Sequence, residues 1–150
     1  MDERARFEEM MEDLLEATGA SRTTLRLDLS GEGAGLDVVS AEALAPGVHS
    51  IKEDTSIRNL RNVPTVRFLD EQRRLLVQND CVKDEPASPP ELVDVYGVRA
   101  QMLAPLLHED RLVGVISVHY VPGPRDWSAD DISALQETSE RIQRDLDGAD

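Results

Sequence analysis

The chain has one cysteine, Cys81, so it cannot form a disulfide within itself. Aromatic residues make up only 3% of its 150 residues, and 30 acidic residues face 16 basic ones, a net charge of −14. This negative charge repels phosphate groups and argues against nucleic-acid or membrane-surface partners. No run approaches the roughly 20 apolar residues of a membrane span. The acidic start MDERARFEEM is unlike a signal peptide. We therefore predict a cytoplasmic protein with no nucleic-acid or membrane partner.

Hydrophobic residues make up 40% of the chain, which is enough for one packed core. The length fits a single domain that needs no metal or disulfide to hold it together. We predict one domain over residues 1–150, with its core at about 7–147 and a frayed C-terminal tail.

The hydrophobic pattern predicts a helix at each end of the chain and several strands between them. Gly19 is placed to end the first helix, Ser88 to cap a short middle helix, and Ser128 with Asp131 to form the capping box of the last helix. The glycine-rich GEGAG is expected to turn into a short strand. The predicted helices cover about 3–18, 55–69 (two short ones), 89–97 and 128–147, and the predicted strands 22–29, 36–40, 73–80, 99–107 and 111–121. Short turns between the strands indicate an antiparallel sheet, with both terminal helices on one face.

The segment VYGVRAQMLAPLLHEDRLVGVISVHY, followed by RDWSADDISAL, resembles the GAF family of sensory domains. The resemblance spans about residues 7–147. It implies an α+β, GAF/PAS-like fold, in which an antiparallel sheet carries the N- and C-terminal helices on one face. Short helices and loops roof a small-molecule pocket on the other. The matching positions are scaffold residues: Pro105, Leu112, Val113, Gly114, Val115, Trp127, Ser128, Asp130 and Asp131.

Polar residues alternate with apolar ones on three of the predicted strands, so they can share the pocket face. Isolated buried charges cost several kcal/mol, and such a face must be solvated, paired or occupied by a ligand. The predicted ligand-binding residues are Arg26, Asp28, Arg67, Phe68, Tyr96, Gln101, Ser117 and His119.

Residues 55–80 carry a local surplus of positive charge in a chain that is otherwise acidic. Arginine binds carboxylates and phosphates through paired hydrogen bonds, so an anionic metabolite is a candidate ligand. The simpler interpretation, which we favour for this segment, is that its arginines are solvated or paired with nearby acids. The residues concerned are Arg58, Arg61, Arg67, Arg73 and Arg74, against Asp70, Glu71 and Asp80.

The cofactors known from the family find little support in these residues. Cyclic-nucleotide binding has a spaced signature that Phe68, Asp70 and Glu71 do not match. Bilin attachment uses a cysteine beside a histidine, and Cys81 has no histidine near it in sequence. Haem would need a pocket histidine; His119 is the best placed, but a lone histidine is more often structural. We therefore predict no cofactor and no metal site.

The predicted function is a regulatory small-molecule-binding domain in signal transduction, without catalytic residues. One alternative is an enzyme similar to free methionine sulfoxide reductases, which need a resolving thiol that Cys81 lacks. Another is a ligand-free interaction module whose cavity is filled by Phe68, Tyr96 or Leu60.

We also predict a homodimer through an apolar stripe on the terminal helices, with a separate output protein as partner. The ordinary alternative is that these residues simply cover the sheet. The stripe would consist of Met10, Met11, Leu14, Leu135 and Ile142.

Overall fold

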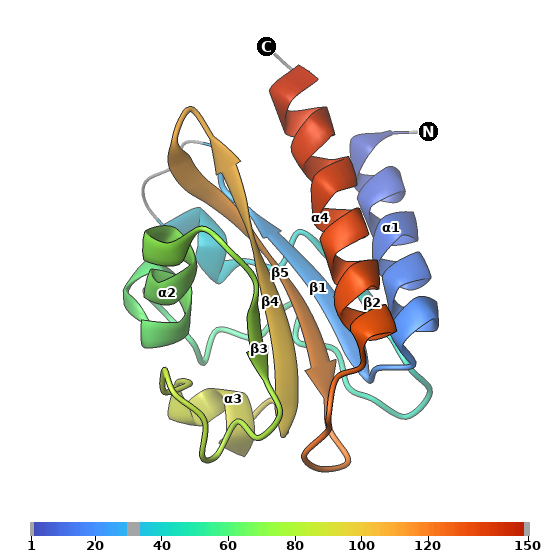
Figure 1. Cartoon of the computed structure of the whole chain (residues 1–150), viewed down its shortest axis with the longest axis vertical. Coiled ribbons are helices and arrows are strands. Elements are labelled where there is room, and N and C mark those ends of the chain that lie inside the picture. The colour runs from blue at the N-terminus through green and yellow to red at the C-terminus, as the bar shows by residue number, and fades with distance from the viewer. Residues whose placement is uncertain (1, 30–33, 149–150) are drawn as a thin grey trace.

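The computed structural model describes residues 2–29 and 34–148, in which a five-stranded antiparallel sheet separates two layers (Figure 1). The strands lie side by side in the order β2-β1-β5-β4-β3. No helix among the described residues is long and apolar enough to cross a membrane. The elements are α1 (Glu3–Thr18), β1 (Arg22–Leu27), the 3-10 helix η1 (Ala34–Asp37), β2 (Ala41–Leu44), η2 (Leu60–Asn62), α2 (Pro64–Gln72), β3 (Leu76–Gln78), α3 (Pro90–Asp94), β4 (Ala100–His108), β5 (Arg111–Tyr120) and α4 (Ala129–Gly148).

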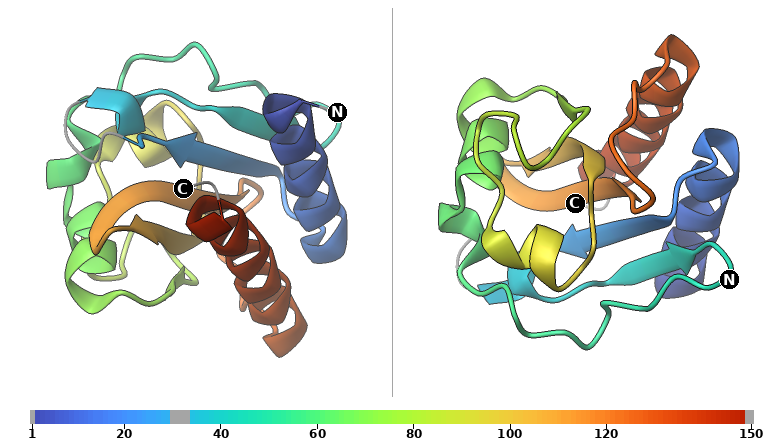
Figure 2. Two further views of the ribbon diagram at one scale, coloured as in Figure 1. Left: turned by 90° about the horizontal axis from the view of Figure 1, so that it is seen from above. Right: turned by 90° about the horizontal axis from the view of Figure 1, so that it is seen from below.

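The two long helices, α1 and α4, cover the same face of the sheet (Figure 2). As predicted, Gly19 ends α1 in the left-handed conformation, at φ 62°. The capping box of α4 is also confirmed, because the Asp131 amide donates to Ser128 Oγ at 3.0 Å and the Ser128 amide donates to Asp131 Oδ2 at 2.9 Å. The α+β fold predicted from the sequence is confirmed.

The five apolar residues predicted to form a dimerisation stripe lie in the core between these helices and the sheet. Each is at most 5% exposed, so they cover the sheet of their own chain and offer no surface to a second copy. The described structure thus agrees with the alternative interpretation, in which these residues simply cover the sheet. Dimerisation itself stays a prediction.

The opposite face of the sheet is roofed by α2, α3 and the loops around them (Figure 1). A second apolar cluster, which includes Leu69 of α2 and Leu92 of α3, packs there against Leu103 and Val115 of the sheet. Strand alternation produces both layers. On β5, Ile116 and Val118 face the long helices, whereas Val115, Ser117 and His119 face the roof.

Three local predictions were wrong. Residues 36–40 form no strand, because η1 occupies residues 34–37 and β2 starts only at Ala41; part of the predicted GEGAG turn, residues 31–33, lies outside the described residues. The strand predicted at 73–80 is shortened to β3, because α2 continues to Gln72. Ser88 does not cap α3, whose N-cap position is held by Pro89 with no side-chain hydrogen bond. Ser88 Oγ instead contacts Gln78 and Gln101.

Candidate ligand site between the sheet and the roof

A small cavity lies between the sheet and its roof. Its volume is about 40 Å³, room for about three water molecules. It brings together five of the eight predicted ligand-binding residues: Arg26, Tyr96, Gln101, Ser117 and His119. Apolar side chains complete the wall, including Leu103 and Val115 from the sheet and Leu60, Val66 and Leu92 from the roof. Polar side chains from the sheet therefore meet mostly apolar side chains at this cavity. That these residues bind a ligand stays a prediction.

The strand register places the polar residues of this wall in rows across the sheet. His119 of β5 lies opposite Arg22 of β1 on one side and Gln101 of β4 on the other. One step along, Ser117 lies opposite Thr24. Residues directly opposite in antiparallel strands put their side chains on the same face. The pairing of the strands alone therefore brings these polar side chains together.

Arg22 is completely buried and connects three parts of the molecule. Its Nη1 lies 3.2 Å from Nδ1 of His119 and 3.4 Å from the carbonyl oxygen of Tyr96. Its Nη2 donates to the carbonyl oxygen of His49 at 2.9 Å. The sequence prediction omitted Arg22 from the site, although strand alternation places it on the same face as Arg26.

Arg26 is a buried cation, 5% exposed, and its side chain bonds to a neutral partner. Its Nη1 donates to the carbonyl oxygen of Leu36 at 3.0 Å, and the side chain of Tyr96 lies nearby on the cavity wall. Within the described residues, no carboxylate oxygen lies within 4.0 Å of Arg26 to form a salt bridge.

Burial and charge set the protonation of the groups around the cavity. Burial, together with the charges of Arg22 and Arg26, holds the pKa of His119 well below its usual value. Burial also raises the pKa of Tyr96, so its hydroxyl keeps its proton. A hydrogen bond from the backbone amide of Ser56 lowers the pKa of Asp54, which therefore stays ionised.

Two polar atoms beside this cluster are buried without a hydrogen-bond partner: Nε of Arg22 and Oγ1 of Thr24. Both belong to the roof face of β1. Buried polar groups are nearly always hydrogen-bonded to protein or ordered water. Neither residue lines the cavity itself, so these unpaired atoms lie behind its wall.

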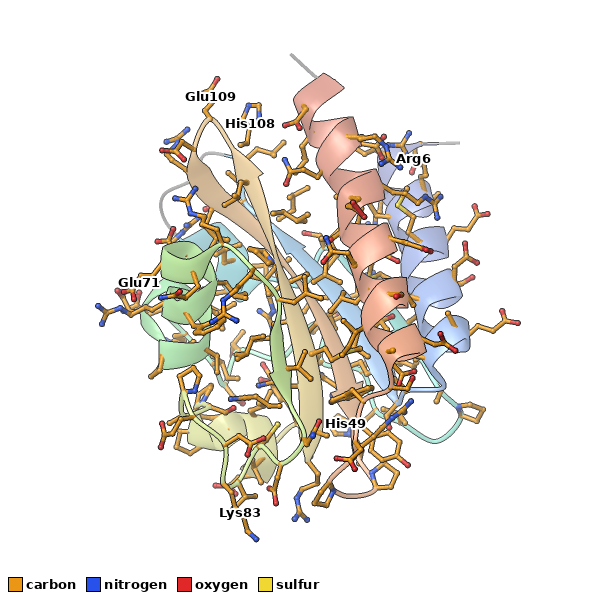
Figure 3. All side chains as sticks on the ribbon, viewed as in Figure 1. Arg6, His49, Glu71, Lys83, His108 and Glu109 are labelled. Atoms are coloured by element: carbon orange, nitrogen blue, oxygen red, sulfur yellow. The ribbon has the colours of Figure 1, made fainter. Side chains whose placement is uncertain are left out.

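Three predicted site residues lie away from the cavity. Asp28 follows the end of β1 and pairs with Arg61 at 3.2 Å. Arg67 is exposed on α2 and lies 3.8 Å from Glu71, which Figure 3 shows pointing away from the sheet. Phe68 is half-buried beneath the guanidinium of Arg74, 5.1 Å from its ring centre. None of the three lines the cavity, and the buried face of α2 is formed by Thr65, Val66 and Leu69 instead.

The arginine-rich segment, residues 55–80, agrees with the interpretation that its arginines are solvated or paired with nearby acids. Arg73 pairs with Asp110 at 3.0 Å, and Arg61 and Arg67 have the carboxylate partners described above. None of these arginines lines the cavity. Any anion bound in the cavity would have to be held by Arg26, not by this segment.

Cys81 lies in neither the cavity nor any metal-binding group. Its thiol is buried and hydrogen-bonded to Ser88, and burial together with Asp84 and Asp80 raises its pKa to about 12. A thiol in that state is a poor nucleophile. In the described part of the chain, no three His, Cys, Asp or Glu side chains gather to bind a metal ion.

Comparison with known proteins identifies the family. The model of the GAF domain matches residues 2–146. The chain belongs to the GAF domain family. No curated protein matches it in sequence.

Solved structures of GAF domains share the fold over nearly the whole chain. The cyanobacteriochrome receptor PixJ has a TM-score of 0.75 at 23% identity, covering 95% of this chain and 93% of PixJ. The blue-light absorbing PixJ GAF domain of Thermosynechococcus elongatus has a TM-score of 0.73 at 22% identity, covering 94% and 84%. A far-red absorbing dark state with bound biliverdin IXa has a TM-score of 0.73 at 16% identity, covering 95% and 90%.

These neighbours correct one prediction and agree with another. They contradict our prediction of no cofactor, because one of these neighbours was solved with bound biliverdin IXa. The PixJ structures are described as those of a cyanobacteriochrome receptor, which is consistent with the prediction of a sensory domain and not an enzyme. Family and neighbours together support a small-molecule-binding sensory domain.

Proposed function

We propose that this GAF domain is a regulatory module whose ligand is a small anionic metabolite bound between the sheet and the roof. The observation that carries the proposal is Arg26, a buried cation on the cavity wall with no carboxylate partner among the described residues. Keeping a charge out of water is costly unless an opposite charge lies beside it. A ligand carboxylate would supply that charge and accept paired hydrogen bonds from the guanidinium.

The remaining wall residues supply donors suited to the same ligand. His119 accepts from Arg22 at Nδ1, which leaves its proton on Nε2 as a donor. Ser117 adds a hydroxyl, whereas the amide nitrogen of Gln101 already donates to Gln78 and Ser88. The anion would thus meet one charged donor, Arg26, and the neutral donors of His119 and Ser117, a set that favours a carboxylate over a cation.

The size of the cavity limits the ligand. Sites for drug-sized molecules have volumes of roughly 300–1,000 Å³, whereas this cavity measures about 40 Å³. Only a very small acid, such as acetate, approaches that volume. A larger ligand would require the roof to move outward.

A thermal-unfolding panel of small carboxylates tests the proposal. At a concentration 100 times Kd, a ligand stabilises the folded state by about 2.7 kcal/mol, which raises Tm by roughly 5–10 °C in a domain of this size. We expect Arg26→Gln to lose the shift. Arg67→Gln, which changes an exposed arginine outside the cavity, should keep it. If no acid raises the Tm of the parent chain at millimolar concentration, the proposal is wrong.

A bilin is the second candidate, favoured by the neighbour solved with biliverdin IXa. The residues described here do not fit a bilin in the closed form, because the cavity is too small and Cys81 does not line it. Incubation with biliverdin, gel filtration and a visible absorption spectrum separate the two candidates. A coloured complex that Arg26→Gln weakens would assign the cavity to a bilin.

Signalling would further require a partner whose binding depends on whether the ligand is bound. A second copy of this chain, as in the predicted homodimer, would be such a partner. The outer faces of α1 and α4 are polar, since their apolar residues are buried. Light scattering at tens of micromolar tests dimerisation directly. A monomer would leave a separate output protein as the partner to seek.

A further inference from the structure

The cavity between the sheet and the roof has two chemically different walls. On the sheet side, Arg26, Ser117 and His119 contribute a cation, a hydroxyl and a ring nitrogen. On the roof side, the lining side chains are mostly apolar. They come from η2, α2 and α3 and from the residues just before these elements: Ile57, Leu60, Val63, Val66, Pro89 and Leu92.

The apolar side of the cavity is closed to solvent. Leu60, Val66 and Leu92 are each at most 8% exposed and belong to the second apolar cluster. Among the described residues that line the cavity, Thr65 and Tyr96 are the only polar ones on the roof side. A ligand atom that points toward the roof therefore meets mainly hydrocarbon.

The two walls set opposite requirements for the two ends of a ligand. A carboxylate at one end would lie against the guanidinium of Arg26, as proposed above. A hydroxyl or a second carboxylate at the other end would lose its water without gaining a partner, which is unfavourable. Each methylene group buried against the roof would instead raise the affinity about fourfold.

The following inference rests on the proposed ligand site and names the class of its ligand. We propose that the cavity binds short aliphatic monocarboxylates, such as acetate and propionate, with the carboxylate at Arg26 and the hydrocarbon end toward the roof. Leu60, Val66 and Leu92 are then the specificity-determining residues. They exclude hydroxy acids and dicarboxylates by their apolar character, and longer acids by the small volume of about 40 Å³ that they leave.

Two acids of equal size test the apolar end in the parent chain. Propionate and glycolate differ only in a methyl group that a hydroxyl replaces, and both are ionised at neutral pH. We expect propionate to bind at least ten times more tightly than glycolate, measured by calorimetry at constant ionic strength. Arg26→Gln should bind neither acid, because both need the same cation.

A matched pair of valine variants tests the limit on chain length. Val66→Ala removes two carbon atoms from the roof side of the cavity. Room for one or two more methylene groups should raise the affinity for butyrate relative to acetate by about four to fifteen times. Val95→Ala makes the same change at an exposed position outside the cavity, and its affinity ratio should equal that of the parent.

The outcomes separate this inference from the proposed function. If glycolate binds as tightly as propionate, the aliphatic ligand class is overturned and the proposed anion site stands. If Val66→Ala keeps the parent's ratio of butyrate to acetate affinity, Val66 does not limit the chain length and the assignment of the roof residues is wrong. If no carboxylate binds to the parent chain, both proposals fail. The comparison of propionate with glycolate needs no variant, so it stands even where Val66→Ala does not fold.

Discussion

The guanidinium of Arg22 lies 3.2 Å from Nδ1 of His119, and the two residues face each other across β1 and β5 in the interior of the domain. A ring nitrogen can accept that hydrogen bond only while the imidazole is neutral. Burial and the charges of Arg22 and Arg26 keep the pKa of His119 low, which is consistent with this geometry. The pair therefore depends on an uncharged histidine.

The first prediction concerns the pH dependence of stability. Below its usual pKa of about 6.5, His119 takes up a proton in the unfolded chain but not in the folded one. The folded state therefore loses stability as the pH falls below this value. The contribution of this single group approaches about 1.4 kcal/mol per pH unit and ends where the folded-state pKa is reached. Urea unfolding between about pH 5 and 7 measures it.

His119→Gln removes this contribution, so its stability should fall less steeply with acid than that of the parent chain. His108→Gln provides the matched control, because His108 lies at the tip of the β4–β5 hairpin (Figure 3). Equal slopes for the parent and His119→Gln would show that the folded state protonates His119 as readily as the unfolded chain does.

The second prediction concerns the start of α4. Ser128→Ala removes the hydroxyl that accepts from the Asp131 amide, and loss of such a cap costs about 1 kcal/mol. Ser133→Ala, an exposed change within the same helix, should alter the free energy of unfolding by less than about 0.5 kcal/mol. Chemical denaturation of both variants measures the difference. Indistinguishable values would mean that the capping box contributes nothing to stability.

The third prediction concerns the close contact of β1 and β5 beside the ligand site. A Cβ atom on Gly114 would lie 2.9 Å from Leu106 Cδ1 and 3.0 Å from the carbonyl oxygen of Arg26. The carbonyl is backbone and cannot swing aside, so Gly114→Ala should destabilise the domain by about 1–3 kcal/mol. Gly123→Ala, which meets no atom within 4 Å, is the control. Equal unfolding free energies for the two variants would contradict the tight packing.

Sequence patterns correctly predicted the parts of the fold that depend on residues close together in the sequence. The strand alternation around Arg26 and Ser117 placed them on the roof face, and the Ser128–Asp131 spacing located the start of α4. The same alternation would have included Arg22, had it been applied to the whole of β1. The prediction that Ser88 caps α3 was wrong because its hydroxyl contacts Gln78 and Gln101 instead. These contacts join segments far apart in the sequence, so local patterns do not reveal them.

The candidate site was harder to predict, because part of it depends on which face of each roof element is buried. Arg67 and Phe68 were placed in the pocket because their segment covers it, but the packing of Val66 and Leu69 turns Arg67 outward. The bonds from Arg22 to the carbonyl oxygens of His49 and Tyr96 have no sequence signature at all. Composition likewise could not reveal that structural neighbours include a biliverdin-bound domain.

The last prediction concerns the reactivity of Cys81. With its pKa raised to about 12, only about one thiol in 10⁴ is ionised at pH 8. A disulfide reagent such as DTNB should therefore label the native chain far more slowly than the chain in denaturing urea, where the thiol is exposed. The absorbance of the released thiolate follows both reactions, and the denatured sample serves as the control for reagent activity.

Rapid labelling of the native chain would mean that the thiol is accessible and ionisable. Cys81 would then again be a candidate for thiol chemistry or covalent ligand attachment, which its buried contact with Ser88 now argues against.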